Sequence, residues 1–235
     1  AAAKMDALNA RCGGGFYLFT RDRLFSRDSG KFAPWERKRG AMLELCRLLA
    51  GEETGLRVRA GDASMLHGTR YILTLDADTR LEPESARALI GAALHPLNRP
   101  VVDPKRGIVF RGHGVLHPRI AVSLESAYRN DFTRLFAPAG GGDPYGSDAG
   151  EVYMDAFQSG GFAGKGIIHV GAYLACLGDR IPEGRVLSHD ALEGAFLRGG
   201  DVSDVELTDG FPSGAVSYFA RAHRWIRGDV QNLSW

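Results

Sequence analysis

The stretch Y-I-L-T-L-D-A-D-T-R, residues 71–80, decides the fold expected for this chain. Its first five residues are mostly β-forming and predict a short buried strand. Asp76 and Asp78 follow at once, and Pro83 then begins a run with apolar residues at helical spacing, which predicts a helix over residues 83–94. The two acids therefore lie at the carboxyl end of a strand in a βα unit, where open α/β sheets bind their ligands.

Asp76 and Asp78 are separated by one residue, so their charges repel each other unless positive charge lies beside them. A divalent cation with oxygen ligands is the usual solution, which makes this pair a candidate metal site. A second interpretation stands beside it, because D-x-D is a short motif: both acids only begin a helix, where negative charge suits the helix dipole.

Composition excludes some classes of function. The 29 basic and 28 acidic side chains leave a net charge of +1, which argues against nucleic acid as the main partner. Cys12, Cys46 and Cys176 are far apart and odd in number, so they predict neither a zinc site nor a disulfide framework, and they suit a reducing compartment. The sequence shows no signal peptide and no apolar run of about 20 residues that could span a bilayer. Because it begins without Met, we interpret it as part of a longer protein.

Periodicity and turn residues predict the remaining elements. The expected helices and strands lie at residues 1–11, 16–20, 34–50, 107–118 (two strands), 121–136, 149–158, 167–177 (strand, then helix), 190–198, 202–207 and from 215 onward, with polar connections at 21–31 and 51–68. In the helix from Pro34 the core-facing residues are Met42, Leu45, Cys46 and Leu49.

Several features outside the main motifs can be interpreted either as purely structural or as functional. The basic first turn 37–39 runs against the helix dipole and is either kept for an anionic ligand or simply solvated. His113 and His117 lie on predicted strands, where a spacing of four does not make a ligand pair, so we interpret them as structural. Lys165 lies in a Gly-rich turn that is not a P-loop, and it is a weak signal for an anion site.

Two later motifs carry more chemistry. Ser188-His189-Asp190 opens a helix, so it either caps that helix or presents Asp190 as a general base, ionised at neutral pH. In R-A-H-R-W, residues 221–225, Arg221, Arg224 and Trp225 share one helix face. Two guanidiniums beside an indole suit a diphosphate with a sugar stacked on the ring, whereas the bland interpretation is a surface helix with one anchoring Trp.

The order of these motifs resembles that of processive, family-2-like glycosyltransferases of the GT-A fold, which carry D-x-D, then an Asp, then Q-x-x-R-W. The stretches W-E-R-K-R-G, H-P-L-N-R-P, G-K-G-I, L-S-H-D-A-L-E-G and H-R-W-I-R-G-D resemble the glycosyltransferase domain of cyclic β-1,2-glucan synthases. The resemblance implies an α/β fold with a GT-A-type, Rossmann-like mixed sheet and helices on both faces. It further implies one domain over residues 1–235, with 1–68 as a remnant of the nucleotide-binding half and 69–235 as the catalytic core.

The same resemblance implies an inverting transfer of glucose from UDP-glucose that builds a β-1,2-glucan with Mg²⁺ or Mn²⁺ as cofactor. It implies a membrane partner through segments outside this chain, at the cytoplasmic face of a bacterial inner membrane, and a glucan attached to protein, with the loop from Tyr145 to Tyr153 as a possible attachment region. The implied roles are the metal (Asp78, Asp76), the donor diphosphate (Asp76, Arg221, Arg224, Lys165), the base (Asp190) and the acceptor (Trp225, His189). The chain departs from the family where Arg221 replaces Gln and where no strand for the uracil precedes residue 15.

Two rival functions remain open on the sequence. D-A-D-T-R also fits the D-x-D-x-T motif of haloacid-dehalogenase-type phosphatases, with Asp76 as nucleophile, Asp78 as acid/base and Mg²⁺ as cofactor. Lys165 and the acids of residues 200–204 would then fill the remaining roles. The other alternative is a non-catalytic domain that binds a nucleotide sugar.

Overall fold

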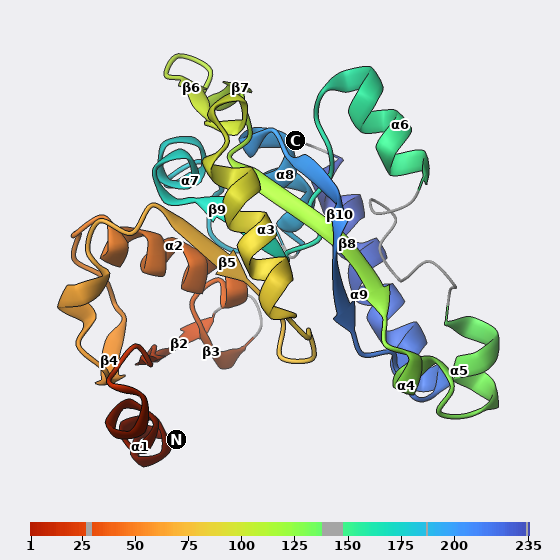
Figure 1. The fold of residues 1–235 in the computed structure, drawn as a ribbon, viewed down its shortest axis with the longest axis horizontal. Coiled ribbons are helices and arrows are strands. Elements are labelled where there is room, and N and C mark those ends of the chain that lie inside the picture. Colours follow the sequence, from red (N-terminus) through yellow and green to blue (C-terminus); the bar gives the residue numbers. More distant parts are fainter. Residues whose placement is uncertain (27–29, 138–147, 187, 234) are drawn as a thin grey trace. The chain divides into compact units, whose positions relative to one another are not determined.

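A computed structural model describes residues 1–26, 30–137, 148–186, 188–233 and 235, and in it the chain divides into two compact units, residues 1–70 and 71–235 (Figure 1). The assignment of both units to one glycosyltransferase domain stays a prediction.

The unit of residues 1–70 contains two helices and two small antiparallel sheets among its described residues. Its elements are α1 (Ala2–Cys12), β1 (Leu18–Thr20), β2 (Arg23–Ser26), β3 (Lys31–Pro34), α2 (Arg37–Leu49), β4 (Arg57–Ala60) and a 3₁₀ turn (Ala63–Leu66). β1 pairs with β4 and β2 pairs with β3. The polar connections expected at 21–31 and 51–68 are therefore wrong in part, since charged side chains on β2 and β4 hide these strands from a hydrophobicity pattern.

Helix α2 buries Met42, Leu43, Cys46 and Leu49, so the predicted core-facing stripe is confirmed except that Leu43 is buried where Leu45 was expected. The basic first turn of α2 is only partly solvated. Arg39 is buried, and its guanidinium lies 2.7 Å from Glu36 Oε2 and over the Trp35 ring. This arginine therefore anchors the start of its own helix.

The unit of residues 71–235 is built on a four-stranded mixed sheet. Its elements are β5 (Tyr71–Thr74), α3 (Pro83–Leu94), a 3₁₀ turn (Pro96–Asn98), β6 (Val101–Asp103), β7 (Ile108–Arg111), β8 (Val115–Val122), α4 (Leu124–Ala127), α5 (Asp131–Phe136), α6 (Asp148–Phe157), β9 (Gly166–His169), α7 (Val170–Leu177), α8 (Asp190–Leu197), β10 (Gly200–Asp209) and α9 (Ala215–Asn232). The strand order is β10-β8-β9-β5, and β6 and β7 form a separate hairpin. β10 and β8 are parallel, whereas β9 is antiparallel to both β8 and β5.

Helices cover both faces of this sheet, as predicted. α3 packs against β8, β9 and β10, and α7 and α8 pack against β9 and β8. Figure 1 shows α3 in front of the sheet and α8 behind it. Leu89 and Ala93 of α3 form a core cluster with Leu116, Ile167 and Val205 of the strands. The mixed α/β architecture expected for a GT-A-like domain is confirmed.

The two strands expected within residues 107–118 are present as β7 and β8. They lie in different sheets, because β7 pairs with β6 while β8 belongs to the central sheet. Another expectation for this unit is wrong. The single helix expected over 121–136 is instead the end of β8 followed by α4 and α5. Ser123 caps α4, and a capping box between Asn130 and Thr133 begins α5. Each cap starts a new short helix, so a long one cannot form.

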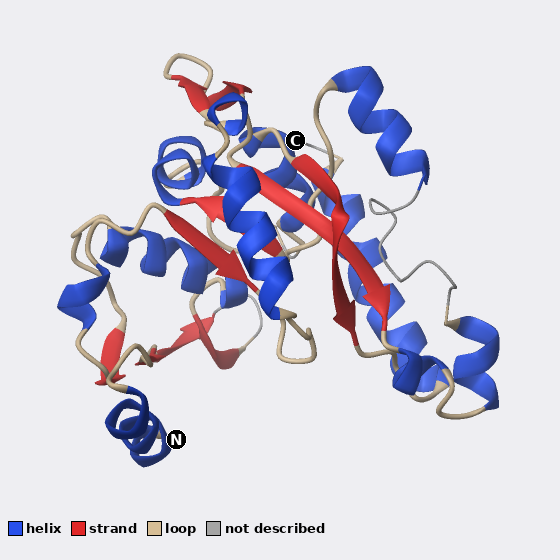
Figure 2. Cartoon of the chain, viewed as in Figure 1, coloured by secondary structure: helices blue, strands red, loops and turns tan. Residues whose placement is uncertain are grey.

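β8 contains Pro118, although it lies between two partners. Proline lacks the N–H that a central strand donates, so it is rare in such a position. The register of β10 shifts at this point, from Val202 opposite Pro118 to Glu206 opposite Arg119. This irregularity sits where the ladder lacks a donor, and the two strands still run side by side to their carboxyl ends (Figure 2).

Candidate active site

The turn that carries the two acids is tied to the end of β10. The Asp76 N–H donates to Thr79 Oγ1 at 3.2 Å, and the Thr79 hydroxyl donates to Asp209 Oδ1 at 2.6 Å. Next to it, the Arg80 N–H donates to the Thr208 carbonyl at 2.8 Å. The last residues of β10 therefore hold the D-A-D turn in one conformation.

Lys165 carries a positive charge into this turn. Its Nζ lies 3.0 Å from Asp76 Oδ2 and 3.1 Å from Asp209 Oδ2, and its side chain is 11% exposed. Burial alone would lower the pKa of Lys165, but the carboxylates of Asp209 and Asp76 outweigh it and raise that pKa. The ammonium is therefore charged across the physiological range.

A histidine of β8 contacts the backbone of the loop that carries Lys165. The buried His117 of β8 places Nδ1 at 3.0 Å from the Lys165 carbonyl, so this imidazole serves the backbone, as predicted for a structural histidine. His113 likewise places Nδ1 at 2.8 Å from the Arg198 carbonyl. Gly164 has φ +76°, and a β-carbon there would come within 2.9 Å of Asp190 Oδ1. Glycine thus lets the loop pass close to the predicted base.

Helix α9 presents Arg221, Arg224 and Trp225 on the same side, as the sequence predicts. The Arg221 guanidinium lies 4.7 Å from the centre of the Trp225 ring and 5.4 Å from that of Phe211. Burial lowers the pKa of Arg221, and the Asp78 carboxylate partly offsets this effect. Arg221 therefore covers one face of the Trp225 ring in a cation–π contact.

α9 reaches the S-H-D loop by close backbone contact. A β-carbon on Gly228 would lie 2.3 Å from Ser188 Cβ, and the Asn232 side chain donates to the Ser188 carbonyl at 2.9 Å. Ser188 was expected as the N-cap of α8. The N-cap is instead His189, whose side chain makes no capping hydrogen bond.

These elements enclose a cavity of about 390 Å³. The residues predicted for the site that line it are Asp76, Asp78, Lys165, Asp190, Arg221, Arg224 and Trp225. Residues separated by about 150 positions in the sequence thus meet at one end of the sheet.

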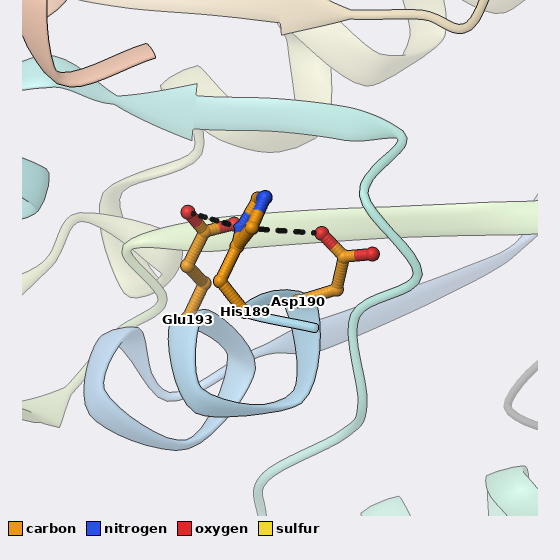
Figure 3. Close-up of side chains that lie close together, drawn as sticks. All are labelled: His189, Asp190 and Glu193. Atoms are coloured by element: carbon orange, nitrogen blue, oxygen red, sulfur yellow. Dashed lines mark ion pairs between the residues drawn. The ribbon is translucent and has the colours of Figure 1, made fainter. Parts of the chain in front are cut away.

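His189 is not among the lining residues, although the sequence resemblance assigned it to the acceptor. Its Nδ1 lies 3.0 Å from Glu193 Oε1 and 3.4 Å from Asp190 Oδ1 (Figure 3). The structure therefore places His189 beside the predicted base. The possible glucan-attachment loop is only partly visible, because residues 138–147 lie outside the described part of the chain.

Sequence reasoning missed several cavity residues, chiefly Asp209, Phe211, Phe162 and Asp229. Asp209 follows shortly after the strand predicted over 202–207, just as Asp76 follows β5, and that position could have marked it. The acids Asp201 and Asp204, which a phosphatase would need, do not line the cavity.

Comparison with known proteins adds an independent observation. The chain is 41% identical over 221 residues, 94% of its length, to cyclic beta-(1,2)-glucan synthase NdvB of Rhizobium meliloti (strain 1021). The chain is homologous to a segment of this cyclic β-1,2-glucan synthase. It spans 8% of the length of NdvB, and no family model matches it. Among the described residues, no helix combines the length and the apolar character needed to cross a membrane.

Proposed function

We propose that this chain is a glycosyltransferase that moves glucose from UDP-glucose to a glucan acceptor with inversion and with a divalent metal, extending a β-1,2-glucan. The observation that carries the proposal is the meeting of the D-A-D turn, Asp190 and the R-A-H-R-W helix in one cavity. The similarity to NdvB supports the choice of glucan.

The acids of the cavity suit a hard divalent cation. Asp78 lines the cavity beside Gly210 and makes no hydrogen bond or ion pair within the part of the chain that the structure describes. Carboxylate oxygens of this kind are what Mg²⁺ and Mn²⁺ prefer. Asp78 would hold such an ion, with Asp76 beside it. When bound, the ion would supply positive charge to the donor diphosphate.

The transfer itself needs a base and a stabilised leaving group. Asp190 would take the proton from the acceptor hydroxyl as its oxygen forms a bond to C1 of the donor glucose. The bond from C1 to the diphosphate oxygen breaks on the opposite side, and UDP leaves with that electron pair. Arg221, Arg224 and Lys165 line the same cavity and would stabilise the growing negative charge. The free face of Trp225 would hold the acceptor sugar.

Calorimetric titration tests this proposal. UDP-glucose should bind in the presence of Mn²⁺, and binding should weaken at least tenfold in EDTA or in Asp78→Asn. Asp190→Asn should keep donor affinity but lose transfer, measured as glucan formed and UDP released. A non-catalytic module would bind the donor yet show no transfer with wild-type chain. A blank titration with metal would contradict the proposal.

Substitution of the predicted nucleophile, Asp76, distinguishes a phosphatase from a glycosyltransferase. A phosphatase would release phosphate from a phosphomonoester, and Asp76→Asn would abolish that release. We expect no such release, because Asp76 is held by Lys165 and the acids of 200–204 lie away from the cavity.

A further inference from the structure

A buried group of polar side chains lies directly behind Asp190. Glu193, on the first turn of α8, is 2% exposed, and its Oε1 accepts a hydrogen bond from the Tyr173 hydroxyl of α7 at 2.8 Å. The same oxygen lies 3.0 Å from His189 Nδ1, which in turn lies 3.4 Å from Asp190 Oδ1. Figure 3 shows the His189 ring between the two carboxylates. One ring nitrogen of His189 and one carboxylate oxygen each of Asp190 and Glu193 all lie within 4.8 Å of one another.

The contact with Glu193 favours a proton on Nδ1 of His189. A neutral imidazole protonated only at Nε2 would turn the lone pair of Nδ1 toward two carboxylate oxygens, which is repulsive. With a proton on Nδ1, the ring would instead place positive charge 3.0 Å from Glu193 Oε1 and 3.4 Å from Asp190 Oδ1. A buried carboxylate is stabilised by such neighbours. The Tyr173 hydroxyl already donates a hydrogen bond to Glu193, and the Nδ1–H group would add an electrostatic contact to the same oxygen.

The state of His189 then acts on Asp190. Asp190 Oδ1 is buried on the His189 side, while the carboxylate as a whole lines the cavity. An Nδ1–H group 3.4 Å from Oδ1 would attract that oxygen and would favour the orientation in which Oδ2 faces the cavity. Loss of this group would leave the Asp190 carboxylate free to rotate away from the acceptor.

We propose that Glu193 is a positioning residue, which holds the Nδ1 proton of His189 and through it orients the Asp190 carboxylate for proton transfer. This inference rests on the proposed function, since it takes Asp190 as the base. Tyr173 helps to hold the Glu193 carboxylate in place through the hydrogen bond that its hydroxyl donates. The functional motif thus includes Glu193, one helical turn after His189, in addition to S-H-D.

The test compares Glu193→Gln with Tyr173→Phe and with Glu183→Gln, which changes an exposed carboxyl on the preceding loop. Glutamine keeps the size of the side chain, but its amide group can donate to Nδ1, so the proton should move to Nε2. The ¹⁵N spectrum of labelled histidine, with His189 assigned by its loss in His189→Gln, should show a protonated Nδ1 in wild type and in Glu183→Gln. In Glu193→Gln it should show an unprotonated Nδ1.

Kinetics provide the second readout. We expect kcat for transfer to fall about 10- to 100-fold in Glu193→Gln, by analogy with the partners that orient metal-binding histidines, while UDP-glucose affinity stays within about twofold. If Glu193→Gln does not fold, Tyr173→Phe decides: it should lower kcat severalfold at unchanged donor affinity.

Distinct results overturn distinct claims. An Nδ1 signal and kcat that do not change in Glu193→Gln overturn the positioning role. Equal losses of kcat and donor affinity, together with a lower melting temperature, show that Glu193 only supports the fold. Failure of the wild-type chain to bind UDP-glucose overturns the proposed function, and the histidine spectrum still decides whether Glu193 sets the state of His189.

Discussion

Lys165 and Asp209 form a partly buried ion pair, in which Nζ lies 3.1 Å from Oδ2. Asp209 also accepts a hydrogen bond from Thr79, so one carboxylate fixes both a cation of the site and the turn between Asp76 and Asp78. Charge-assisted hydrogen bonds of this kind contribute about 1.5–3 kcal/mol each.

Asp209→Asn should therefore weaken the site more than the fold. The neutral amide would leave Lys165 with Asp76 as its remaining carboxylate and would loosen the D-A-D turn. We expect the Kd for UDP-glucose to rise about tenfold, which corresponds to ~1.4 kcal/mol. Calorimetry measures this change. Asp204→Asn, on the exposed part of β10, is the control and should leave the Kd unchanged; equal effects of the two variants would contradict a role for Asp209.

Gly228→Ala should destabilise the chain, because the new β-carbon would collide with Ser188 at 2.3 Å. Overpacking against backbone typically costs about 1–3 kcal/mol. Gly91→Ala provides the matched control: this exposed glycine of α3 has nothing within 4 Å of its missing β-carbon and should gain about 0.5–1 kcal/mol from higher helix propensity. Urea unfolding of both variants gives the two signs, and a neutral result for Gly228→Ala would contradict the close contact.

Thiol chemistry should distinguish Cys12 from the other two cysteines. Cys12 is exposed, whereas Cys46 and Cys176 are buried. Burial raises the pKa of Cys176 to about 11, so it carries almost no thiolate at pH 8. A disulfide reagent such as DTNB should modify one thiol quickly in the folded chain and three in denaturant. Cys12→Ser should remove the fast reaction, and a second fast thiol in the native chain would refute the burial of the others.

Stability should fall in mild acid because of His113. Burial lowers the pKa of its imidazole in the folded chain, while the unfolded chain keeps a value near ~6.5. The stabilising contribution is therefore complete above that pH and is lost as the pH falls through the folded pKa. Urea unfolding at pH 7.5 and 5.0 measures the loss. His113→Gln should show a smaller loss than wild type, and His223→Gln, at an exposed position, should behave as wild type.

The sequence predicts the residues that have local signals. Tyr71 to Leu94 folds as strand, acidic turn and helix because an apolar run, the D-x-D spacing and Pro83 all act within a few positions. The predicted cavity residues were found for a similar reason, since each belongs to a motif with its own spacing. The resemblance assigns these residues to one reaction, and in the structure they line one cavity.

Residues whose role depends on tertiary contacts were missed. Asp209 matters because the antiparallel bridge between Arg80 and Thr208 brings it to Thr79, and no spacing along the chain encodes that contact. Glu193 has the pattern of an ordinary first-turn acid, and only burial against Tyr173 distinguishes it. His189 does not line the cavity, because the backbone at the start of α8 decides which residues of the S-H-D motif face it. The role of His189 at the acceptor stays a prediction.

The contact of Gly228 with Ser188 also limits how relatives can be recombined. The helix with Arg224 and Trp225 and the loop with Asp190 are fitted to each other without room for one extra carbon atom. A chimera that exchanges α9 alone would pair this loop with a helix that is fitted to the loop of a different protein. An exchange of this site between relatives should therefore transfer residues 188–190 and 215–232 together.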